Sequence, residues 1–558
     1  MSSIVIGTSD QERIVYDRSS RETHTHVIGV SGTGKSYFLE SMIRSDIAKG
    51  AGVCFIDPHG ETAKNILSWL ATSGIRHNQV HYLCPGEGDF SVGFNPLALP
   101  EASTSRRVSD MVTACERVWG GNSTVETPRL RKCLRATLFA LAHHRLSLLE
   151  ADMFTSVRHR DRRDTLVSQL PPGGIADEWA EFAAYSDREF REYFESTRSR
   201  LFEFATSPAI QPIIGQTEDV LDFSVCMERG DIVIVNLAES GTFTKREGQL
   251  LGAMITADLY STARQRDVAK AKRQPFYCYI DECADYLNED IAKSLDETRK
   301  YGLHYILSHQ RLNQLRSVSD DCYDAVMANA QTKIVFKVDD DDSAEILCRH
   351  MLRADFDLEK PKETLIRPVA VGQEIIELFS WGSFETDTET SSYGSQEGTG
   401  SGDSVSMFVP DEGEGAGQTE GTSQAVSSGT SSSESFGRST TQSETRNQTL
   451  QTVYELMPTA VYSLDEIIHL GINLIRNMPM RHALLRMSNQ RAIPITTLEV
   501  KNRRPLKAQL DRYVRKLHQR SYCTQNTSDV MVAINDRLNT SPNDLDLDDD
   551  QFSYPVKS

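Results

Sequence analysis

The sequence predicts an α/β protein built around a mostly parallel sheet, and three observations indicate this fold class. Short apolar runs such as THVIGV (25–30) and GVCFID (52–57) are each followed by an amphipathic helical stretch, an alternation typical of parallel sheets. In the stretch that begins at Ser36, apolar residues recur at helical spacing on one face. The strand pattern then returns in DIVIVNLAE (231–239), FYCYID (276–281) and HYILSHQ (304–310).

Length and composition are those of a large globular chain. The 558 residues allow a sizeable core with additions, and 39% hydrophobic with 25% charged residues is typical of a soluble protein. No apolar run approaches the roughly 18–20 residues that a membrane helix needs, and the N-terminal residues lack a secretory pattern. The ten cysteines include no CxxC pair, so their spacing indicates neither a zinc site nor a disulfide framework. A reducing cytoplasm is the expected location.

Composition and periodicity divide the chain into six predicted segments. Residues 103–217 carry long helical stretches and hardly any strand-like run, which predicts an all-helical insertion. Residues 383–449 are rich in Ser, Thr, Gly and Glu and cannot bury enough apolar surface to offset chain entropy, which predicts disorder. The full set is a first core part (1–102), the helical insertion (103–217), a second core part (218–382), a disordered linker (383–449), a return of core strands and helix (450–500), and a basic helix with an acidic, flexible tail (501–558).

The stretch GVSGTGKS fits the phosphate-binding pattern GxxxxGK[ST] in full. Its glycines let successive backbone N–H groups curl around phosphate oxygens, while the lysine reaches the β- and γ-phosphates. The serine hydroxyl is suited to Mg²⁺, and the following helix adds its positive N-terminal end. The sequence therefore predicts a site for ATP with Mg²⁺, formed by Gly29, Val30, Ser31, Gly32, Thr33, Gly34, Lys35 and Ser36.

Two apolar runs end on an aspartate, and only one of them supplies the pair of acids that ATP hydrolysis uses. A metal-site aspartate is expected at a strand end next to the phosphate-loop strand, and a following glutamate can orient and deprotonate the attacking water. Asp281 and Glu282 form that pair. Asp57 is followed by Pro58, which turns the chain away, so Asp57 is expected to shape this turn or to lie near the nucleotide.

Three further polar residues have alternative interpretations. Gln310 ends a predicted strand, where its amide could sense the γ-phosphate or simply be a polar strand end. Arg299 and Lys300 lie in the last turn of a helix closed by Gly302, where a positive charge also complements the helix dipole.

Six stretches, taken together and in order, resemble the HerA–FtsK superfamily of ring ATPases. They are THVIGVSGTGKS, FIDPHGE, GFNPLA, YIDECADYL, RKYGLHYILSHQRLNQL and NAQTKIVFKVDDDDSAEIL. Within the superfamily they look most like the TraG/TraD-class coupling proteins of conjugative type IV secretion, over residues 1–382 and more weakly over 451–500. The resemblance implies a RecA-like P-loop NTPase core and a homo-hexamer that threads DNA through its central pore using ATP.

The resemblance also implies roles for single residues. Asp281 corresponds to the family's metal aspartate and Glu282 to its catalytic glutamate, while Gln310 corresponds to its sensor. Arg299, in the RK[FY]G element, corresponds to the arginine that completes a neighbouring subunit's active site. Typical coupling proteins begin with membrane-spanning helices and this sequence shows none, so attachment to the inner membrane is expected only through partners. Those partners would be a relaxase, a nuclease or secretion-channel proteins.

Other functions stay open from the sequence. One is a HerA-type helicase motor in DNA repair or phage defence; another is an ATPase that drives protein export or secretion-system assembly. A nucleotide-gated scaffold is the third, and the presence of Glu282 argues against it. Any DNA contact is expected to go to phosphates without sequence preference. The basic stretches 158–164 and 501–520 are candidates for it or are solvated faces, in a chain of net charge −19.

Overall fold

The computed structural model describes residues 3–539 apart from gaps at 75–78, 99–103, 121–127, 267–273, 288–294, 296, 353–365, 387–397, 408–417, 428–438, 459–463, 489 and 502–504. The chain divides into two compact units, one of Met1–Asp357 with Leu464–Ser558 and one of Leu358–Ser463. The acidic tail that the sequence predicts to be flexible lies beyond residue 539, outside the described residues. Among the helices that are described, none combines the length and apolar character needed to cross a bilayer.

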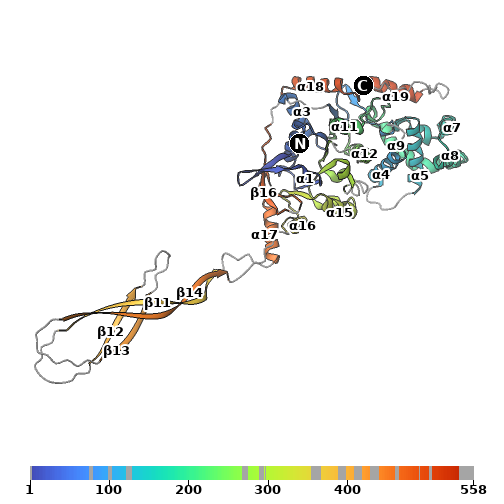
Figure 1. The fold of residues 1–558 in the computed structure, drawn as a ribbon. Coiled ribbons are helices and arrows are strands. Elements are labelled where there is room, and N and C mark those ends of the chain that lie inside the picture. The colour runs from blue at the N-terminus through green and yellow to red at the C-terminus, as the bar shows by residue number, and fades with distance from the viewer. Residues whose placement is uncertain are drawn as a thin grey trace, which may run out of the picture. The chain divides into compact units, whose positions relative to one another are not determined.

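One large sheet organises the first unit (Figure 1). Its described strands follow the order β2-β1-β16-β15-β10-β3-β9-β8-β4-β7-β5. All neighbours from β10 to β5 are parallel, whereas β15, β16, β1 and β2 pair antiparallel at one side, which confirms the predicted α/β class with a mostly parallel sheet. In sheet order the strands are Glu12–Tyr16, Ile4–Ser9, Ile493–Thr497, His482–Arg486, Thr332–Val335, Thr25–Ile28, Leu303–His309, Phe276–Ile280, Gly52–Asp57, Ile232–Asn236 and Val80–Leu83.

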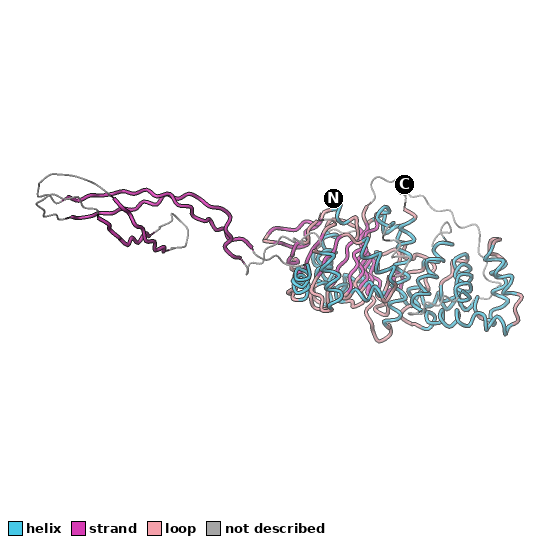
Figure 2. The backbone as a smooth tube through the Cα atoms, turned by 90° about the horizontal axis from the view of Figure 1, so that it is seen from below, coloured by secondary structure: helices cyan, strands magenta, loops and turns pink. Residues whose placement is uncertain are grey.

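Helices cover both faces of the parallel strands (Figure 2). Along β4, Val53 and Phe55 pack in the cluster that includes α2 and α3, whereas Cys54 and Ile56 pack in the cluster that includes α12. A strand buried on both faces is continuously apolar, which explains why these runs do not alternate with polar residues. The helices around the sheet are α1 (Arg18–Arg21), α2 (Lys35–Ala48), α3 (Glu61–Ser73), α11 (Phe223–Arg229), α12 (Lys245–Arg264), α14 (Leu312–Arg316), α15 (Asp320–Asn329), α16 (Asp341–Met351), α17 (Leu464–Arg476) and α18 (Lys507–Arg520).

Between β6 (Phe90–Val92) and β7 the described chain is helical. Aromatic side chains fill the interior of this block, where Trp179 stacks on Phe194 and meets Phe182 edge to face. The longest helix, α9, begins with a capping box in which Ser186 and Glu189 satisfy each other's backbone N–H groups. The α-helices of the block are α4 (Thr104–Gly120), α5 (Pro128–His143), α6 (Ala151–Thr155), α7 (Arg160–Ser168), α8 (Gly174–Ala183), α9 (Asp187–Thr206) and α10 (Gln211–Ile214).

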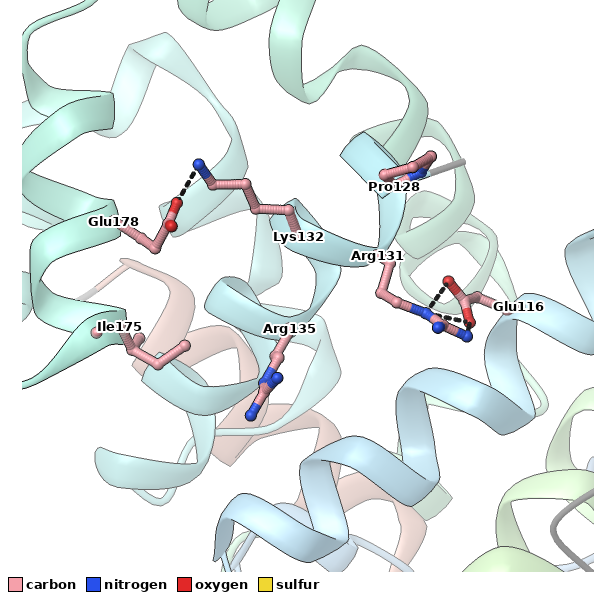
Figure 3. Close-up of a pocket in the computed structure, with 8 residues that line it drawn as sticks. Glu116, Pro128, Arg131, Lys132, Arg135, Ile175 and Glu178 are labelled. Carbon is pink, nitrogen blue, oxygen red and sulfur yellow. Dashed lines mark hydrogen bonds and ion pairs between the residues drawn. The ribbon is translucent and has the colours of Figure 1, made fainter. Parts of the chain in front are cut away.

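A cavity of about 560 Å³ opens in this block among α4, α5 and α8 (Figure 3). Two of its basic side chains are paired with acids: Arg131 donates to Glu116 at 2.7–3.0 Å, and Lys132 forms an ion pair with Glu178. None of the residues predicted from the sequence to bind nucleotide lines it.

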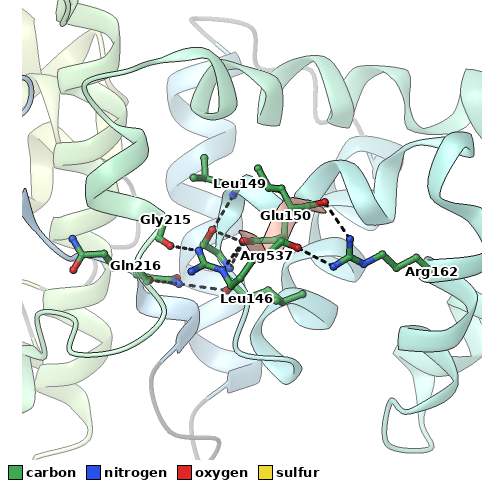
Figure 4. Close-up of polar contacts among 10 residues, drawn as sticks. Leu146, Leu149, Glu150, Arg162, Gly215, Gln216 and Arg537 are labelled. Carbon is green, nitrogen blue, oxygen red and sulfur yellow. Dashed lines mark hydrogen bonds and ion pairs between the residues drawn. The ribbon is translucent and has the colours of Figure 1, made fainter. Parts of the chain in front are cut away.

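The C-terminal part of the chain fastens the helical block to the sheet. β17 (Thr524–Asn526) pairs with β6, and α19 (Thr527–Asn539) packs on α10. From α19, the Arg537 guanidinium donates to the buried carboxylate of Glu150 at 3.0 Å, and Arg162 donates to the carbonyls of Arg537 and Leu538 (Figure 4). The helix α19 is an element that the sequence analysis did not predict.

The second unit consists of antiparallel strand pairs. β11 (Ile366–Thr386) pairs with β14 (Ser439–Pro458), and β12 (Gly398–Met407) pairs with β13 (Gln418–Ser427). The structure describes these strands within the segment 383–449, for which the sequence predicts disorder, and residues 387–397, 408–417 and 428–438 of that segment lie outside the described residues. Helix resumes at α17.

We predict that a buried histidine next to β3 makes the fold sensitive to acid. His24 lies between a carbonyl and an amide: its Nε2 faces the Leu295 carbonyl at 2.8 Å, and its Nδ1 accepts from the Tyr305 N–H at 2.9 Å. Burial lowers the pKa of His24 from 6.5 to about 4. Because the unfolded chain then binds the extra proton first, stability should hold above pH 6.5 and fall toward pH 4, by up to about 3 kcal/mol from this group.

Urea unfolding midpoints measured at several pH values test this prediction. His24→Gln, which cannot be protonated, should flatten the loss between pH 6.5 and 4 relative to the wild type. His482→Gln, at an exposed histidine of β15, is the matched control and should leave the profile unchanged. A profile that is equally steep in the His24→Gln protein contradicts the prediction.

Candidate active site

A cavity of about 470 Å³ lies at the carboxyl ends of the parallel strands β3, β9, β8 and β4. In open α/β sheets this edge is where ligands bind, and the volume suits a small molecule. Residues from five separate parts of the chain line the cavity: Val30, Ser31, Gly32, Gly34, Lys35, Ser36, Tyr37, Glu40, Asp57, His59, Glu61, Thr62, Asn65, Asp281, Glu282, Gln310 and Met480.

The loop between β3 and α2 has the backbone conformation that its glycines allow. Gly34 caps α2 with φ 103°, a conformation that other residues rarely adopt. At Gly29 a Cβ atom would lie 2.5 Å from the Cβ of Phe336, so close packing against β10 also requires glycine there. The loop is tied down by two backbone hydrogen bonds, Val30 N–H to the Lys337 carbonyl and Arg481 N–H to the Thr33 carbonyl, each 2.9 Å long.

Lys35 and Ser36 begin α2 at this loop. Lys35 is buried and lines the cavity, while the Ser36 hydroxyl lies 3.5 Å from the Asp281 carboxylate. The other Asp281 oxygen accepts from the Ser308 hydroxyl at 2.8 Å, which fixes the carboxylate in place. A hydroxyl and a carboxylate beside each other are hard oxygen donors, so these residues fit Mg²⁺, which binds through few protein ligands and retains water.

The strand order corrects one expectation from the sequence. Asp281 directly follows β8, which is not next to the phosphate-loop strand β3, because β9 lies between them. β9 delivers Gln310 to the same edge and contributes Ser308 to the hydrogen bond with Asp281. Asp281 still lies beside Ser36, because α2 begins at the edge of the sheet that all three strands form.

Glu282 has an unusual backbone and a well-defined side chain. Its φ and ψ are 45° and 51°, a left-handed conformation that costs a residue with a side chain about 1–3 kcal/mol. Gln310 donates to one carboxylate oxygen at 2.7 Å, and Gln314, in α14, donates to the other at 3.4 Å. The carboxylate is thus held at the cavity wall by two amides.

Asp57 has both oxygens engaged by the turn that follows β4. They accept from the backbone N–H groups of His59 at 2.9 Å and Ala63 at 2.8 Å. Burial, with Asp281 nearby, raises the pKa of Asp57 although these hydrogen bonds oppose the shift. Asp57 also lines the cavity, so it shapes the turn and lies beside the candidate site at the same time.

The other residues singled out by sequence lie elsewhere. Arg299 is exposed in the short helix η6 (Arg299–Tyr301) and is not among the residues that line the cavity. In the stretch 158–164 three of the four arginines have partners inside the molecule: Arg160 pairs with Asp187, Arg162 binds carbonyls of α19, and Arg163 lies 4.0 Å from the centre of the Phe190 ring. The fourth, Arg158, is exposed. Helix α18 of the second stretch exposes Arg512, Arg515 and Lys516.

Sequence reasoning missed several residues at this site. Ser308 and Gln314 touch the two acids, and Met480 reaches the cavity from the C-terminal part of the chain. A signal for Gln314 exists, because it follows Gln310 by one helical turn. Met480 lies far away in sequence, and no local pattern links it to the phosphate loop.

Comparison with known proteins agrees with this geometry. A family model described as the central domain of helicase HerA matches residues 7–80, which contain the phosphate loop. A second, described as the TraM recognition site of TraD and TraG, matches residues 275–351, which contain Asp281, Glu282 and Gln310. A search of curated proteins found no match.

Solved structures of the plasmid coupling protein TrwB have a similar fold. An unbound form of this bacterial conjugative coupling protein has a TM-score of 0.51 and 15% identity, covering 90% of this chain and 91% of that one. The complex with the ATP analogue ADPNP gives 0.51 and 14%, covering 90% and 92%. The complex with ADP and Mg²⁺ gives 0.50 and 14%, covering 91% and 92%.

The two family matches fall on the two halves of the cavity, and the fold is shared over most of the chain. They bear out the resemblance seen in the sequence: two stretches of the chain are similar to the HerA central domain and to the TraD and TraG family model, and the fold is similar to that of the coupling protein TrwB.

Proposed function

We propose that this protein is an ATP-hydrolysing motor that moves DNA, acting as a ring of identical subunits in the manner of coupling proteins. The observation that carries the proposal is the placement of Lys35, Asp281 and Glu282 around one cavity, with Gln310 bonded to Glu282. A scaffold that only binds nucleotide needs the phosphate loop alone, whereas these acids add the groups that hydrolysis uses.

Each residue has a chemical task in this proposal. Lys35 and the N–H groups of the loop would hold the phosphates of ATP. The Ser36 hydroxyl and the Asp281 carboxylate would hold Mg²⁺, which neutralises charge on the phosphate oxygens when bound. Glu282 would orient a water molecule and accept its proton, and Gln310 with Gln314 keeps the carboxylate aimed at the cavity.

Relatives support the choice of ligands and the class of work. Structures of the plasmid coupling protein TrwB hold an ATP analogue, or ADP with Mg²⁺. The family model over residues 275–351 is described by recognition of TraM, which supports a protein partner of the DNA-processing complex in addition to DNA. Transport through the pore of a homo-hexamer completes the proposal, with a relaxase, a nuclease or secretion-channel proteins as further partners.

A HerA-type helicase motor is the second candidate, and the match of residues 7–80 to the HerA central domain favours it. Both candidates predict ATP hydrolysis stimulated by DNA. They differ in outcome, because a helicase separates the strands of a forked duplex and a coupling-type translocase displaces a bound obstacle without separating them.

The first prediction for this function separates binding from hydrolysis. Lys35→Ala should weaken ATP binding about 10–100-fold, since a charged hydrogen bond contributes about 1.5–3 kcal/mol. Glu282→Gln should bind ATP normally and lose turnover by about 10²-fold or more. Calorimetric titration with a non-hydrolysable analogue and a phosphate-release assay measure the two effects.

Glu61→Gln is the control, because this acid also lines the cavity at the start of α3, whereas Glu282 is the acid that Gln310 and Gln314 hold. It should change turnover little. Normal turnover in the Glu282→Gln protein would assign water activation to another residue.

The second prediction concerns Arg299, which lies outside the cavity of its own subunit. In a ring it would reach the γ-phosphate site of the neighbouring subunit, where such arginines raise the rate by about 10³-fold or more. Arg299→Ala protein should therefore bind ATP and hydrolyse it poorly. Mixing it with Glu282→Gln protein should restore part of the activity, because some interfaces then pair an intact arginine with an intact glutamate.

Lys300→Ala, at the adjacent exposed cation, is the matched control and should keep its activity. Light scattering must show that mixed rings form. If they form and activity does not return, Arg299 does not act across the interface.

The third prediction concerns DNA contacts. Affinity should fall steeply with salt and depend little on sequence, because the contacts go to phosphates. Replacing Arg512 and Lys516, exposed one turn apart on α18, with glutamine should reduce the slope of log affinity against log salt by about 1–2. Arg188→Gln, at a cation of α9 whose side chain is 88% exposed, is the control and should leave this slope unchanged.

Fluorescence anisotropy over a salt series, with two unrelated duplexes, measures both properties. An unchanged slope would remove α18 from the DNA contact. A strong preference for one of the duplexes at fixed salt would contradict a general translocase.

A further inference from the structure

A buried cluster of metal-ligand side chains lies away from the candidate active site. It consists of His81 in β5, Cys226 in α11 and Asp231 just before β7, and a ligand atom from each lies within 4.8 Å of the other two. All three side chains are at most 2% exposed. None of them lines the cavity at the phosphate loop.

Local structure places these three residues together. Helix α11 ends at Gly230, whose φ of 70° and hydrogen bond back to the Cys226 carbonyl turn the chain sharply. The Asp231 N–H also donates to the Cys226 carbonyl, at 2.9 Å, so the thiol and the carboxylate come from one tight turn. β5 pairs in parallel with β7 at the edge of the sheet and brings His81 beside them.

The two nitrogens of His81 have different surroundings. Nδ1 lies 2.8 Å from the Ser521 hydroxyl and 3.3 Å from the Cys523 sulfur. Nε2 lies 3.5 Å from the Asp231 carboxylate. When Nδ1 donates its hydrogen to Ser521, the lone pair of Nε2 points at a carboxylate oxygen with Cys226 alongside, an arrangement that a cation between them stabilises.

We propose that His81, Cys226 and Asp231 bind one zinc ion. Imidazole, thiolate and carboxylate are the donors that zinc takes, at about 2.0–2.3 Å, so tetrahedral ligands lie roughly 3.3–3.8 Å apart. The present separations need only small side-chain adjustments to reach that geometry. A water molecule completes the coordination, and zinc is preferred over Mg²⁺ because the thiolate is a soft ligand.

The ion would secure the C-terminal part of the chain. With zinc on Nε2, the Nδ1–H of His81 would donate to Ser521 and Cys523 and so orient the ring, as metal-bound histidines do with their outer partners. The same segment continues into β17 on β6 and into α19, whose Arg537 binds Glu150 in the helical block. Zinc at this edge would therefore hold sheet, α11 and C-terminal segment together, independently of ATP.

The experiment is a metal determination on the full chain. Protein produced with added zinc and dialysed against metal-free buffer should hold one zinc per chain by plasma mass spectrometry. Cys226→Ser, His81→Gln and Asp231→Asn should each lose it, and Ser521→Ala should weaken zinc binding about 10–100-fold. Cys115→Ser, at a cysteine buried in α4, is the control and should retain the full content.

A measurement on the wild type keeps the test decisive if a variant fails to fold. Replacing zinc with Co²⁺ should give the intense visible bands of a tetrahedral site and a thiolate-to-cobalt charge-transfer band. Wild-type protein that is folded by circular dichroism and takes up neither metal would overturn the proposal and leave a hydrogen-bonded cluster. Zinc retained in full by the Cys226→Ser protein would overturn it as well.

Discussion

Parallel pairing of β3, β9, β8 and β4 is the constraint on which the rest of this structure depends. The register Val27↔Ser308, Ile280↔Leu307 and Ile56↔Ile280 brings four strand ends to the same level. The residue after each end then faces one cavity: the phosphate loop after β3, Gln310 after β9, Asp281 after β8 and the Asp57 turn at β4. A slip of one residue in any pair would turn these side chains into the helical layers.

The candidate site and the stability of the core are coupled through this register. The backbone continues the ladder past the strand ends, since Gly29 donates to the His309 carbonyl and Asp281 donates to the Ile56 carbonyl. Glu282 leaves the ladder in a left-handed conformation, and the energy of that backbone is offset by its hydrogen bonds to Gln310 and Gln314. The strained residue is thus the one whose carboxylate must point into the cavity.

Segments far apart in sequence close the molecule around the sheet. Residues 464–539 return to both sides of it: β15 and β16 extend it beside β10, and α18 covers β5. Beyond α18, β17 and α19 tie the helical block to this layer through Arg537 and Glu150. Met480 at the cavity and Ser521 beside His81 show that the same return reaches two distinct polar sites.

The sequence by itself determined the features that rest on local patterns. The glycines and Lys35 of the phosphate loop, the acids Asp281 and Glu282 after an apolar run, and the alternation of strands and helices are all written within short windows. These are set by backbone conformation and side-chain periodicity, which neighbouring residues dictate.

Tertiary structure alone decided which strands became neighbours and which distant side chains met. Long-range pairing decided three features: the position of β9 between β3 and β8, the antiparallel strands beside β10, and the hairpins within 366–458. The residues of one strand do not specify which distant strand it pairs with. Cysteine spacing indicated no metal site. His81, Cys226 and Asp231 nevertheless lie together, because β5 pairs directly with β7 although the helical block separates the two strands in sequence. Such contacts form only in the folded chain. Their energy comes from burying apolar surface between residues that are far apart in sequence.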